Sequence, residues 1–306
     1  MTTSRVLIIG ATGRLGQNLV RTSIESGRPT FALVRGSSFS NPEKSALLEE
    51  FTRAGVQLLK GSLEDVSSLV EAVGQVDAVI CAVSSNQVED QKLLIQAIKR
   101  VGSVKRFIPA EFGTDPDRVQ TKGLEHDFYK KKAEIRRIIE REGIPHTYIS
   151  CNFFMSYLLP SLVQPGFKTP PRDRVKIFGD GNTKAVFVRE CDVASFTIST
   201  LDDPRTLNKV LYLRPPGNIF SLNELVEMWE MKIGKKLEKV CVPQVEVLRI
   251  IEETSNPNDL EMYFIHAAFI KGVQTYFKVE DYGVEGTQLY PHIKYTTISQ
   301  YLDSVL

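Results

Sequence analysis

The sequence predicts an α/β protein built on a doubly wound parallel sheet, with a smaller C-terminal portion that binds substrate. Two observations predict the sheet. A short apolar run near the start leads into three glycines and a helical pattern, and strand and helix patterns then alternate up to residue 150. The third observation predicts the second portion: beyond Cys151, prolines interrupt the alternation of strands and helices.

The first strand and the loop after it occupy residues 5–16. After Arg5, residues 6–9 are apolar and partly β-branched, which is typical of a buried central strand. Glycines permit a tight turn, a close approach of a pyrophosphate to the backbone, and close packing of the following helix. We therefore predict a dinucleotide site in this loop rather than a plain turn. Its residues are Gly10, Ala11, Thr12, Gly13, Arg14, Leu15 and Gly16.

The second strand, expected at residues 29–34, indicates which dinucleotide binds. An NAD site usually has an acidic residue about twenty positions beyond the glycines, whereas a basic residue accommodates the 2′-phosphate of NADP. No acidic residue occurs between Pro29 and Asn41, and Arg35 and Lys44 are both basic. The pattern favours NADP. The alternative is that both side chains are solvated surface cations.

The alternation continues along the chain. Strands are expected at residues 56–59, 77–82, 105–109 and 146–150, and helices at 42–54, 63–73, 88–101 and 127–141. Ligands of such a sheet bind at the carboxyl ends of its strands, here near residues 10–16, 35, 82–85 and 109–113. Later strands are expected at 175–178 and 184–187, and helices near 191–201, 221–233 and 245–253.

These patterns predict the domain organisation. We expect residues 1–152 to form an NADP-binding domain of the Rossmann type. Residues 153–306 are expected to be mainly substrate-binding, with some segments returning to the main sheet.

One lysine is a candidate for chemistry. Phe128, Lys132, Ile135 and Ile139 fall on one stripe of the helix expected at 127–141, which places the lysine on the inward face. Desolvation and Arg136, one turn further on, would both lower its pKa, as a general acid or base near neutral pH requires. The alternative is a structural lysine whose amine reaches solvent at the helix edge.

Other polar and aromatic residues carry less information. Tyr129 has an alanine four positions later, so the Tyr-x-x-x-Lys pair of short-chain dehydrogenases is absent at this place. His126, His146 and His292 are expected at the surface or at strand ends, and His266 in the core rather than against substrate. Glu111 and Asp115 follow a strand end, where they either shape the site or cap a helix. Aromatic residues at 153–157 are expected in the core rather than against a flat substrate.

Composition excludes several classes of function. The 306 residues carry a formal net charge of +1 with 42% hydrophobic residues, as in a soluble globular protein with no electrostatic reason to bind nucleic acid. The four cysteines are widely spaced, so neither a metal site nor a redox pair is expected. No apolar run is long enough to span a membrane, and no secretory signal is evident, so the expected location is the cytoplasm.

The chain resembles the plant isoflavone-reductase-like family, the NmrA-like atypical short-chain dehydrogenases that include phenylcoumaran benzylic ether, pinoresinol-lariciresinol and isoflavone reductases. The motifs that carry the resemblance lie at residues 10–16, 104–113, 132–137, 143–148, 178–182, 203–208, 229 and 289–291. They extend over essentially the whole chain and are specific for the family, although not for one substrate.

The resemblance implies a function and a set of site residues. NADPH would deliver hydride to a benzylic or conjugated carbon of a phenolic, phenylpropanoid-derived substrate. The glycine loop, Arg35 and Lys44 would bind the cofactor, Arg136 would be a further cofactor contact, and Lys132 would be the catalytic acid or base. Arg14, Ala110 and Thr114 depart from common family residues at their positions, which leaves the identity of the substrate open.

Two other functions are compatible with the same motifs. Relatives in the negative-transcriptional-regulator group bind the dinucleotide without turnover, so a non-catalytic NADP sensor is the main alternative, against which the inward Lys132 argues. An epimerase or dehydratase of nucleotide sugars is a third candidate, and the absence of Tyr-x-x-x-Lys argues against it. Base rates for soluble enzymes favour a homodimer.

Overall fold

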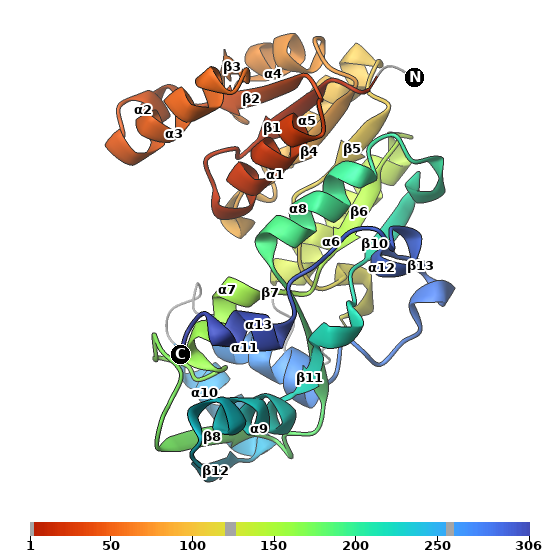
Figure 1. Ribbon diagram of the computed structural model, residues 1–306. Coiled ribbons are helices and arrows are strands. Elements are labelled where there is room, and N and C mark those ends of the chain that lie inside the picture. Colours follow the sequence, from red (N-terminus) through yellow and green to blue (C-terminus); the bar gives the residue numbers. More distant parts are fainter. Residues whose placement is uncertain (1–2, 120–126, 255–259) are drawn as a thin grey trace. The chain divides into compact units, whose positions relative to one another are not determined.

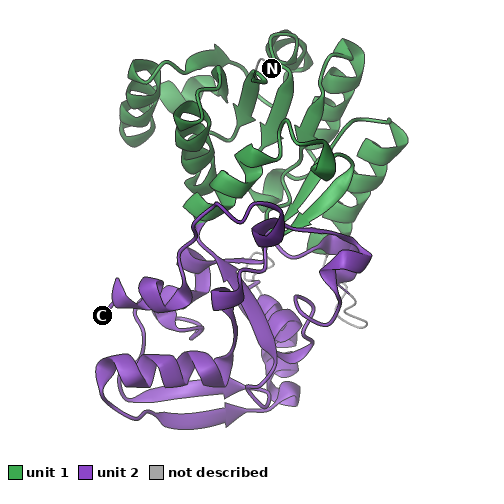
Figure 2. Ribbon diagram, turned by 45° about the vertical axis from the view of Figure 1, so that its right-hand side comes forward, with its two compact units in different colours: residues 1–112, 126–150, 190–212 green, residues 113–125, 151–189, 213–306 purple. Residues whose placement is uncertain are grey.

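The computed structural model describes residues 3–119, 127–254 and 260–306. The chain divides into two compact units, drawn in different colours in Figure 2. Unit 1 comprises residues 1–112, 126–150 and 190–212, and unit 2 comprises residues 113–125, 151–189 and 213–306. Neither unit is a single stretch of sequence, because the chain passes between them several times.

A five-stranded parallel sheet in the order β3-β2-β1-β4-β5 forms the centre of unit 1 (Figure 1). The strands are β1 (Val6–Ile9), β2 (Thr30–Val34), β3 (Gln57–Lys60), β4 (Ala78–Cys81) and β5 (Arg106–Ile108). The order runs outward in both directions from β1, which confirms the doubly wound topology predicted from the sequence. Such sheets bind ligands where the order reverses, at the carboxyl ends of the strands.

Two further strands extend this sheet. A parallel bridge between Phe107 and His146 continues it from β5 to β6 (Thr147–Ser150). Strand β6 pairs in parallel with β10 (Lys209–Tyr212). Strand β10 and helix α8 (Glu190–Ser199) come from the second half of the chain, and both belong to unit 1.

Helices cover both faces of the sheet of unit 1. They are α1 (Arg14–Glu25), α2 (Gly36–Phe39), α3 (Pro42–Arg53), α4 (Val66–Val73), α5 (Gln91–Val101), α6 (Asp127–Arg141) and α8. Side chains of α4, α5 and α6 share a core with Leu7 and Ile9 of β1, whereas α1 packs against α8. The four-residue helix α2 was not predicted, because one turn is too short to show a helical period.

Local sequence explains where several of these helices begin and end. Asn41 accepts a hydrogen bond from the backbone N–H of Lys44 at the start of α3, and Pro42 fits the first helical position. Asp65 caps α4 in the same way. Helix α5 ends at Gly102, whose φ of 71° lies in the left-handed region that glycine adopts without strain.

Unit 2 has a mixed three-stranded sheet and a parallel pair of strands. In the sheet, β9 (Lys184–Val188) lies between β7 (Phe153–Phe154) and β11 (Ile219–Ser221). The pair is β8 (Arg174–Phe178) with β12 (Glu238–Val242). A short strand, β13, occupies Gly283–Glu285. The helices are α7 (Met155–Leu158), α9 (Leu222–Ile233), α10 (Gln244–Glu253), α11 (Glu261–Ile265), a π-helical turn at His266–Ile270, α12 (Gly286–Leu289) and α13 (Ile298–Asp303).

Trp229 is a central residue of the core of unit 2. It is fully buried on α9, and its indole N–H donates a hydrogen bond to the carbonyl of Pro171 at 2.8 Å. Phe153, Phe187 and Phe269 pack together in the same core. The core position expected for Phe153 is therefore correct, whereas Tyr157 is 46% exposed.

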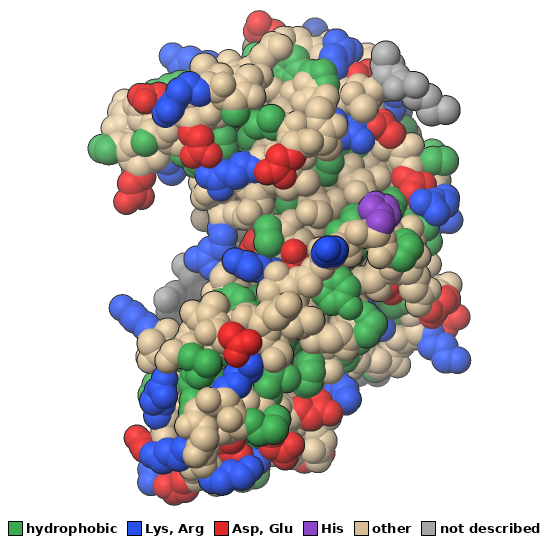
Figure 3. All heavy atoms as spheres, in the orientation of Figure 1, with side chains coloured by type: hydrophobic (Ala, Val, Ile, Leu, Met, Phe, Trp, Pro, Cys, Tyr) green, Lys and Arg blue, Asp and Glu red, His purple; other side chains and the backbone are tan. Residues whose placement is uncertain are grey.

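Charges of both signs are mixed on the surface. In the face drawn in Figure 3, Lys and Arg side chains lie among Asp and Glu side chains over both units. None of the helices in the part of the chain that the structure describes is long and apolar enough to cross a membrane.

Candidate functional site

The loop between β1 and α1 requires glycine at two of its three glycine positions. Gly10 has a φ of 85°, and a Cβ added there would lie 2.5 Å from the carbonyl oxygen of Ala82. A Cβ on Gly16 would lie only 2.0 Å from the carbonyl oxygen of Gly10. Both distances are shorter than any real contact of a Cβ atom. The glycines thus allow α1 and the strand ends to approach one another closely, as the sequence predicted.

The N-terminus of α1 is free of acidic side chains. Gly13 is the N-cap residue and has no side chain that could accept a hydrogen bond from the first turn, which contains no acidic residue. The first N–H groups of a helix lack partners within the helix, and the helix dipole favours negative charge there. This end of α1 is suited to the pyrophosphate of a dinucleotide.

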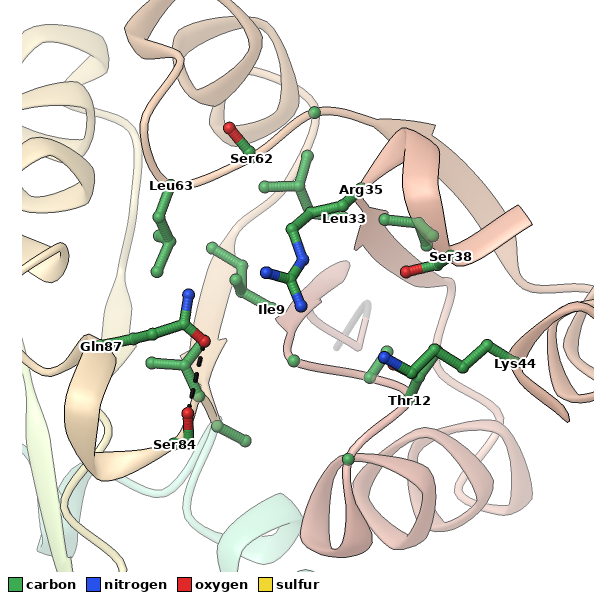
Figure 4. A pocket seen from close by; sticks show the side chains of 17 residues that line it. Ile9, Thr12, Leu33, Arg35, Ser38, Lys44, Ser62, Leu63, Ser84 and Gln87 are labelled. Atoms are coloured by element: carbon green, nitrogen blue, oxygen red, sulfur yellow. Dashed lines mark hydrogen bonds between the residues drawn. The ribbon is translucent and has the colours of Figure 1, made fainter. Parts of the chain in front are cut away.

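A cavity of about 280 Å³ opens at this edge of the sheet (Figure 4). The predicted cofactor residues that line it are Gly10, Ala11, Thr12, Gly13, Arg35 and Lys44. Arg14, Leu15 and Gly16 do not line it. Leu15 and Gly16 are buried residues of α1, and Arg14, its first residue, is exposed.

Arg35 and Lys44 reach the cavity from two elements. Arg35 follows the last residue of β2, and Figure 4 shows its guanidinium extending over the cavity. Lys44 lies in the first turn of α3, and its amine points toward Thr12 in the same view. In the described chain neither side chain forms an ion pair or hydrogen bond with another residue. Two basic groups line the cavity and none of its described lining residues is acidic, which fits a 2′-phosphate.

The cavity is also lined by residues that were not predicted from the sequence. Gly61, Ser62 and Leu63 follow β3, and Gln87 follows β4 beyond the expected segment 82–85. A Cβ on Gly61 would lie 2.5 Å from the hydroxyl oxygen of Ser68, so this glycine also allows a close approach. The rule that ligands bind at carboxyl ends of strands, applied to β3 as well, would have found this segment.

Lys132 is buried on the inward face of α6, as the helical stripe predicted. It is 5% exposed, and Ile135 and Ile139 on the same face are buried. Its Nζ donates a hydrogen bond of 2.6 Å to the main-chain carbonyl of Glu111 and lies 4.5 Å from the ring centroid of Phe128. Lys132 does not line the cavity described above.

Arg136 occupies the same face, one helical turn beyond Lys132. It is 1% exposed, and its guanidinium donates two hydrogen bonds to the carboxylate of Glu111, at 2.6 and 2.5 Å. The guanidinium carbon lies 4.4 Å from the ring centroid of Tyr148. Arg136 does not line the cavity. Its role as a cofactor contact stays a prediction.

The remaining candidates have structural roles in the described chain. Asp115 accepts a hydrogen bond from the backbone N–H of Asp117, as an N-cap residue does. His146 lies just before β6, and its Nδ1 contacts the carbonyl of Ile144 at 2.9 Å. His266 is buried, and burial lowers the pKa of both histidines. His126 lies outside the described residues.

The described residues contain no cluster of three or more His, Cys, Asp or Glu side chains that could hold a metal ion. All four cysteines are free thiols, of which Cys81 and Cys151 are buried. Burial raises the pKa of the Cys81 thiol to about 12, so this cysteine is not a nucleophile near neutral pH.

A family model, described as the NmrA-like family, matches residues 2–302 of the chain. The chain belongs to the NmrA-like family. Probable pinoresinol-lariciresinol reductase 3 of Arabidopsis thaliana is 61% identical over 99% of this chain and 98% of its own length. Phenylcoumaran benzylic ether reductase IRL1 of Ginkgo biloba is 54% identical over 98% of both chains. These relatives confirm the resemblance that the sequence motifs indicated.

Two solved structures have the same fold as the present chain. An isoflavone reductase matches with a TM-score of 0.95 at 43% identity over the whole of both chains. The structure of AtPrR2 with NADP+ and (+)-pinoresinol also matches with a TM-score of 0.95, at 39% identity over the whole of both chains.

Proposed function

We propose that this chain is an NADPH-dependent reductase that transfers hydride to a benzylic or conjugated carbon of a phenylpropanoid-derived phenol. Relatives that match the whole chain are named as reductases of such compounds, and one was solved with NADP+ and pinoresinol. The observation that carries the proposal is the buried amine of Lys132, in the same unit as a cavity suited to NADP.

The residues of unit 1 fit the cofactor at both of its charged parts. The glycine loop and the N-terminus of α1 would bind the pyrophosphate through the N–H groups of the first helical turn. Glycine is needed in this loop because a side chain at Gly10 or Gly16 would collide with backbone. Arg35 and Lys44 would bind the 2′-phosphate. NADPH, when bound, supplies the hydride. The protein positions the nicotinamide against the acceptor carbon and controls one proton.

Lys132 would control that proton. A neutral lysine amine can still donate one N–H to the carbonyl of Glu111, while its lone pair accepts a proton from a substrate phenol. Once the phenol proton is removed, the phenolate would expel the oxygen bound to the benzylic carbon, so that this C–O bond breaks and the oxygen leaves as an anion that is then protonated. The resulting quinone methide would accept hydride at the benzylic carbon. Alternatively, the same group would return a proton after hydride transfer. Either step makes Lys132 a general acid or base, which contributes about 10²- to 10⁴-fold to rates.

The first experiment measures NADPH oxidation by the purified protein with a panel of substrates. The panel contains a phenylcoumaran, pinoresinol, an isoflavone, a coniferyl ester and a leucoanthocyanidin. We expect turnover of one member, and Lys132→Ala should lower kcat by roughly 100-fold or more with NADPH binding nearly unchanged. Lys130→Ala is the matched control, because Lys130 is an exposed lysine on the same helix.

Two outcomes would contradict parts of the proposal. Full activity of Lys132→Ala would remove the lysine from the mechanism. Tight NADPH binding with no turnover of any panel member would favour the non-catalytic NADP sensor over the reductase.

The proposal extends to organisation and assembly. Residues 1–152 would bind the cofactor, residues 153–306 would mainly bind substrate, and the protein would act as a cytoplasmic homodimer. Two-fold dimers are the commonest assembly of oligomeric enzymes. Size-exclusion chromatography with light scattering tests the dimer, since a mass equal to that of one chain would contradict it.

A further inference from the structure

The chain after β5 makes a tight, strained turn. The backbone N–H of Glu111 donates to the carbonyl of Pro109 at 2.8 Å, only two residues back. Phe112, the next residue, has a φ of 35°. A bulky residue other than glycine at positive φ is unfavourable by about 1–3 kcal/mol, so such a conformation persists only where the surroundings fix it.

Two buried side chains, from the neighbouring helices α5 and α6, fix this turn. The amide oxygen of Gln91, on α5, accepts a hydrogen bond from the backbone N–H of Ala110 at 2.7 Å. The guanidinium of Arg136, on α6, makes the two short hydrogen bonds to the Glu111 carboxylate. Gln91 and Arg136 are each 1% exposed, so water does not compete for these bonds.

The same turn provides the acceptor for Lys132. Glu111 uses its carboxylate to bind Arg136 and its main-chain carbonyl to bind Nζ of Lys132. Lys132 and Arg136 are one helical turn apart, so α6 is joined to the turn at two adjacent points. The ring of Tyr148, on β6, packs against the guanidinium and limits its movement.

Stability alone is a poor explanation for the ion pair. Desolvation of two charges offsets most of their attraction, and well-packed apolar residues of similar volume often stabilise a protein as much or more. A bidentate arginine–carboxylate pair does, however, fix geometry in a way that apolar side chains do not. Here the geometry that it fixes includes the carbonyl bound to Lys132.

We propose that Glu111 and Arg136 are positioning residues for Lys132. Their ion pair holds the strained turn so that the carbonyl of Glu111 orients the lysine amine toward the reacting proton. The inference rests on the proposed role of Lys132 as general acid or base.

The test is a double-mutant cycle with Glu111→Gln and Lys132→Ala, using the panel member that the wild-type protein reduces fastest. We expect Glu111→Gln to lower kcat roughly 10- to 100-fold, because displacement of the Lys132 amine by about 1 Å would have an effect of that size. KM and the Kd of NADPH should stay within about twofold, since the interaction acts on the chemical step. In the Lys132→Ala background, Glu111→Gln should cause no further loss of kcat.

A crystal structure of Glu111→Gln gives a readout that does not depend on turnover. We expect the carbonyl of residue 111 to move out of hydrogen-bond distance of Nζ of Lys132, and φ of Phe112 to leave the positive region. Arg136→Lys is the second variant, because it keeps the positive charge but not the two parallel hydrogen bonds. It should reproduce the loss of kcat.

Arg106→Lys is the matched control. Arg106 is also a buried arginine of unit 1, but it lies at the opposite end of β5 and donates to the hydroxyls of Thr147 and Thr206. Arg106→Lys should lower the melting temperature about as much as Arg136→Lys does, but it should leave kcat within about twofold of wild type.

The outcomes separate this inference from the proposed function. If Lys132→Ala lowers kcat as expected but Glu111→Gln lowers kcat by the same factor in both backgrounds, the positioning role is wrong and the proposed function stands. An unchanged contact between Nζ and the carbonyl in the Glu111→Gln crystal structure also overturns the positioning role, whatever the activity. Full activity of Lys132→Ala would instead contradict the proposed function itself.

Discussion

Two pairs of basic side chains in unit 1 differ in what surrounds them. Arg35 is exposed and Lys44 half-buried, and both line the cavity without an ion-pair partner in the described chain. Lys132 and Arg136 are buried and bind the carbonyl and the carboxylate of Glu111. We call them the open pair and the closed pair.

The difference indicates what each pair can do. An exposed cation without a partner keeps its hydration and loses little when an anionic ligand replaces water, so the open pair is suited to ligand recognition. A buried cation is tolerated only with hydrogen-bond partners in place. The closed pair is therefore suited to holding a geometry, and disturbing it should affect folding and chemistry rather than cofactor choice.

The largest expected effect is on stability. Arg136→Met leaves the Glu111 carboxylate buried without its partner, which should lower the free energy of unfolding by about 3–5 kcal/mol. Arg35→Met removes an exposed charge without a partner and should change it by less than about 0.5 kcal/mol. Urea unfolding followed by circular dichroism measures both values.

A double variant shows whether the loss comes from the uncompensated charge. Arg136→Met with Glu111→Met removes both charges of the ion pair and should recover most of the stability. If the double variant is as unstable as Arg136→Met alone, packing around the guanidinium, including its contact with Tyr148, is the cause. Equal stabilities of Arg35→Met and Arg136→Met would remove the distinction between the two pairs.

The next largest effect is on cofactor choice. Arg35→Asp should raise the Kd of NADPH by roughly 100-fold, because it replaces attraction to the 2′-phosphate with repulsion. The Kd of NADH should change by no more than about threefold. Isothermal titration calorimetry with both cofactors provides the comparison. Arg53→Asp, at an exposed arginine elsewhere in unit 1, is the control and should affect neither. An equal loss for both cofactors would mean that Arg35 does not contact the 2′-phosphate.

Most of the sheet of unit 1 could be predicted from the sequence, because its strands are short, mostly buried and separated by helices. Strand β10 was missed as an element, since residues 209–212 are only partly apolar and pair with β6 across a long separation in sequence. In unit 2, β12 was missed because it begins with Glu238 and Lys239 and is largely exposed, and β7, β11 and β13 were missed because each has only two or three residues. Strands of that length are defined by their partners and not by their own pattern.

In the candidate site, too, features set by neighbouring residues could be predicted, whereas contacts between residues far apart in the sequence could not. Gly10, Gly16, Arg35 and the inward face at Lys132 could be predicted, because spacing along one strand or helix determines them. The partner of Arg136 could not, because Glu111 lies 25 positions away and only the fold brings the two together. Without an observed partner, a carboxylate after a strand is equally well explained by capping, which is what the structure assigns to Asp115.

The smallest expected effect is that of salt, and it distinguishes the two pairs without any substitution. The Debye length falls from about 10 Å at 0.1 M to about 3 Å at 1 M salt, which screens exposed charges far more than buried ones. Between these concentrations the Kd of NADPH should rise by a few fold, and that of NADH by less, because NADH lacks the 2′-phosphate. In Arg35→Asp the additional salt dependence of NADPH binding over NADH binding should disappear.

The difference in unfolding free energy between wild type and Arg136→Met should stay nearly constant over the same salt range, since the Glu111–Arg136 pair is shielded from solvent ions. If the salt dependence of that stability difference is as large as that of NADPH binding, water reaches the Glu111–Arg136 ion pair. The positioning role proposed for this ion pair would then lose its physical basis.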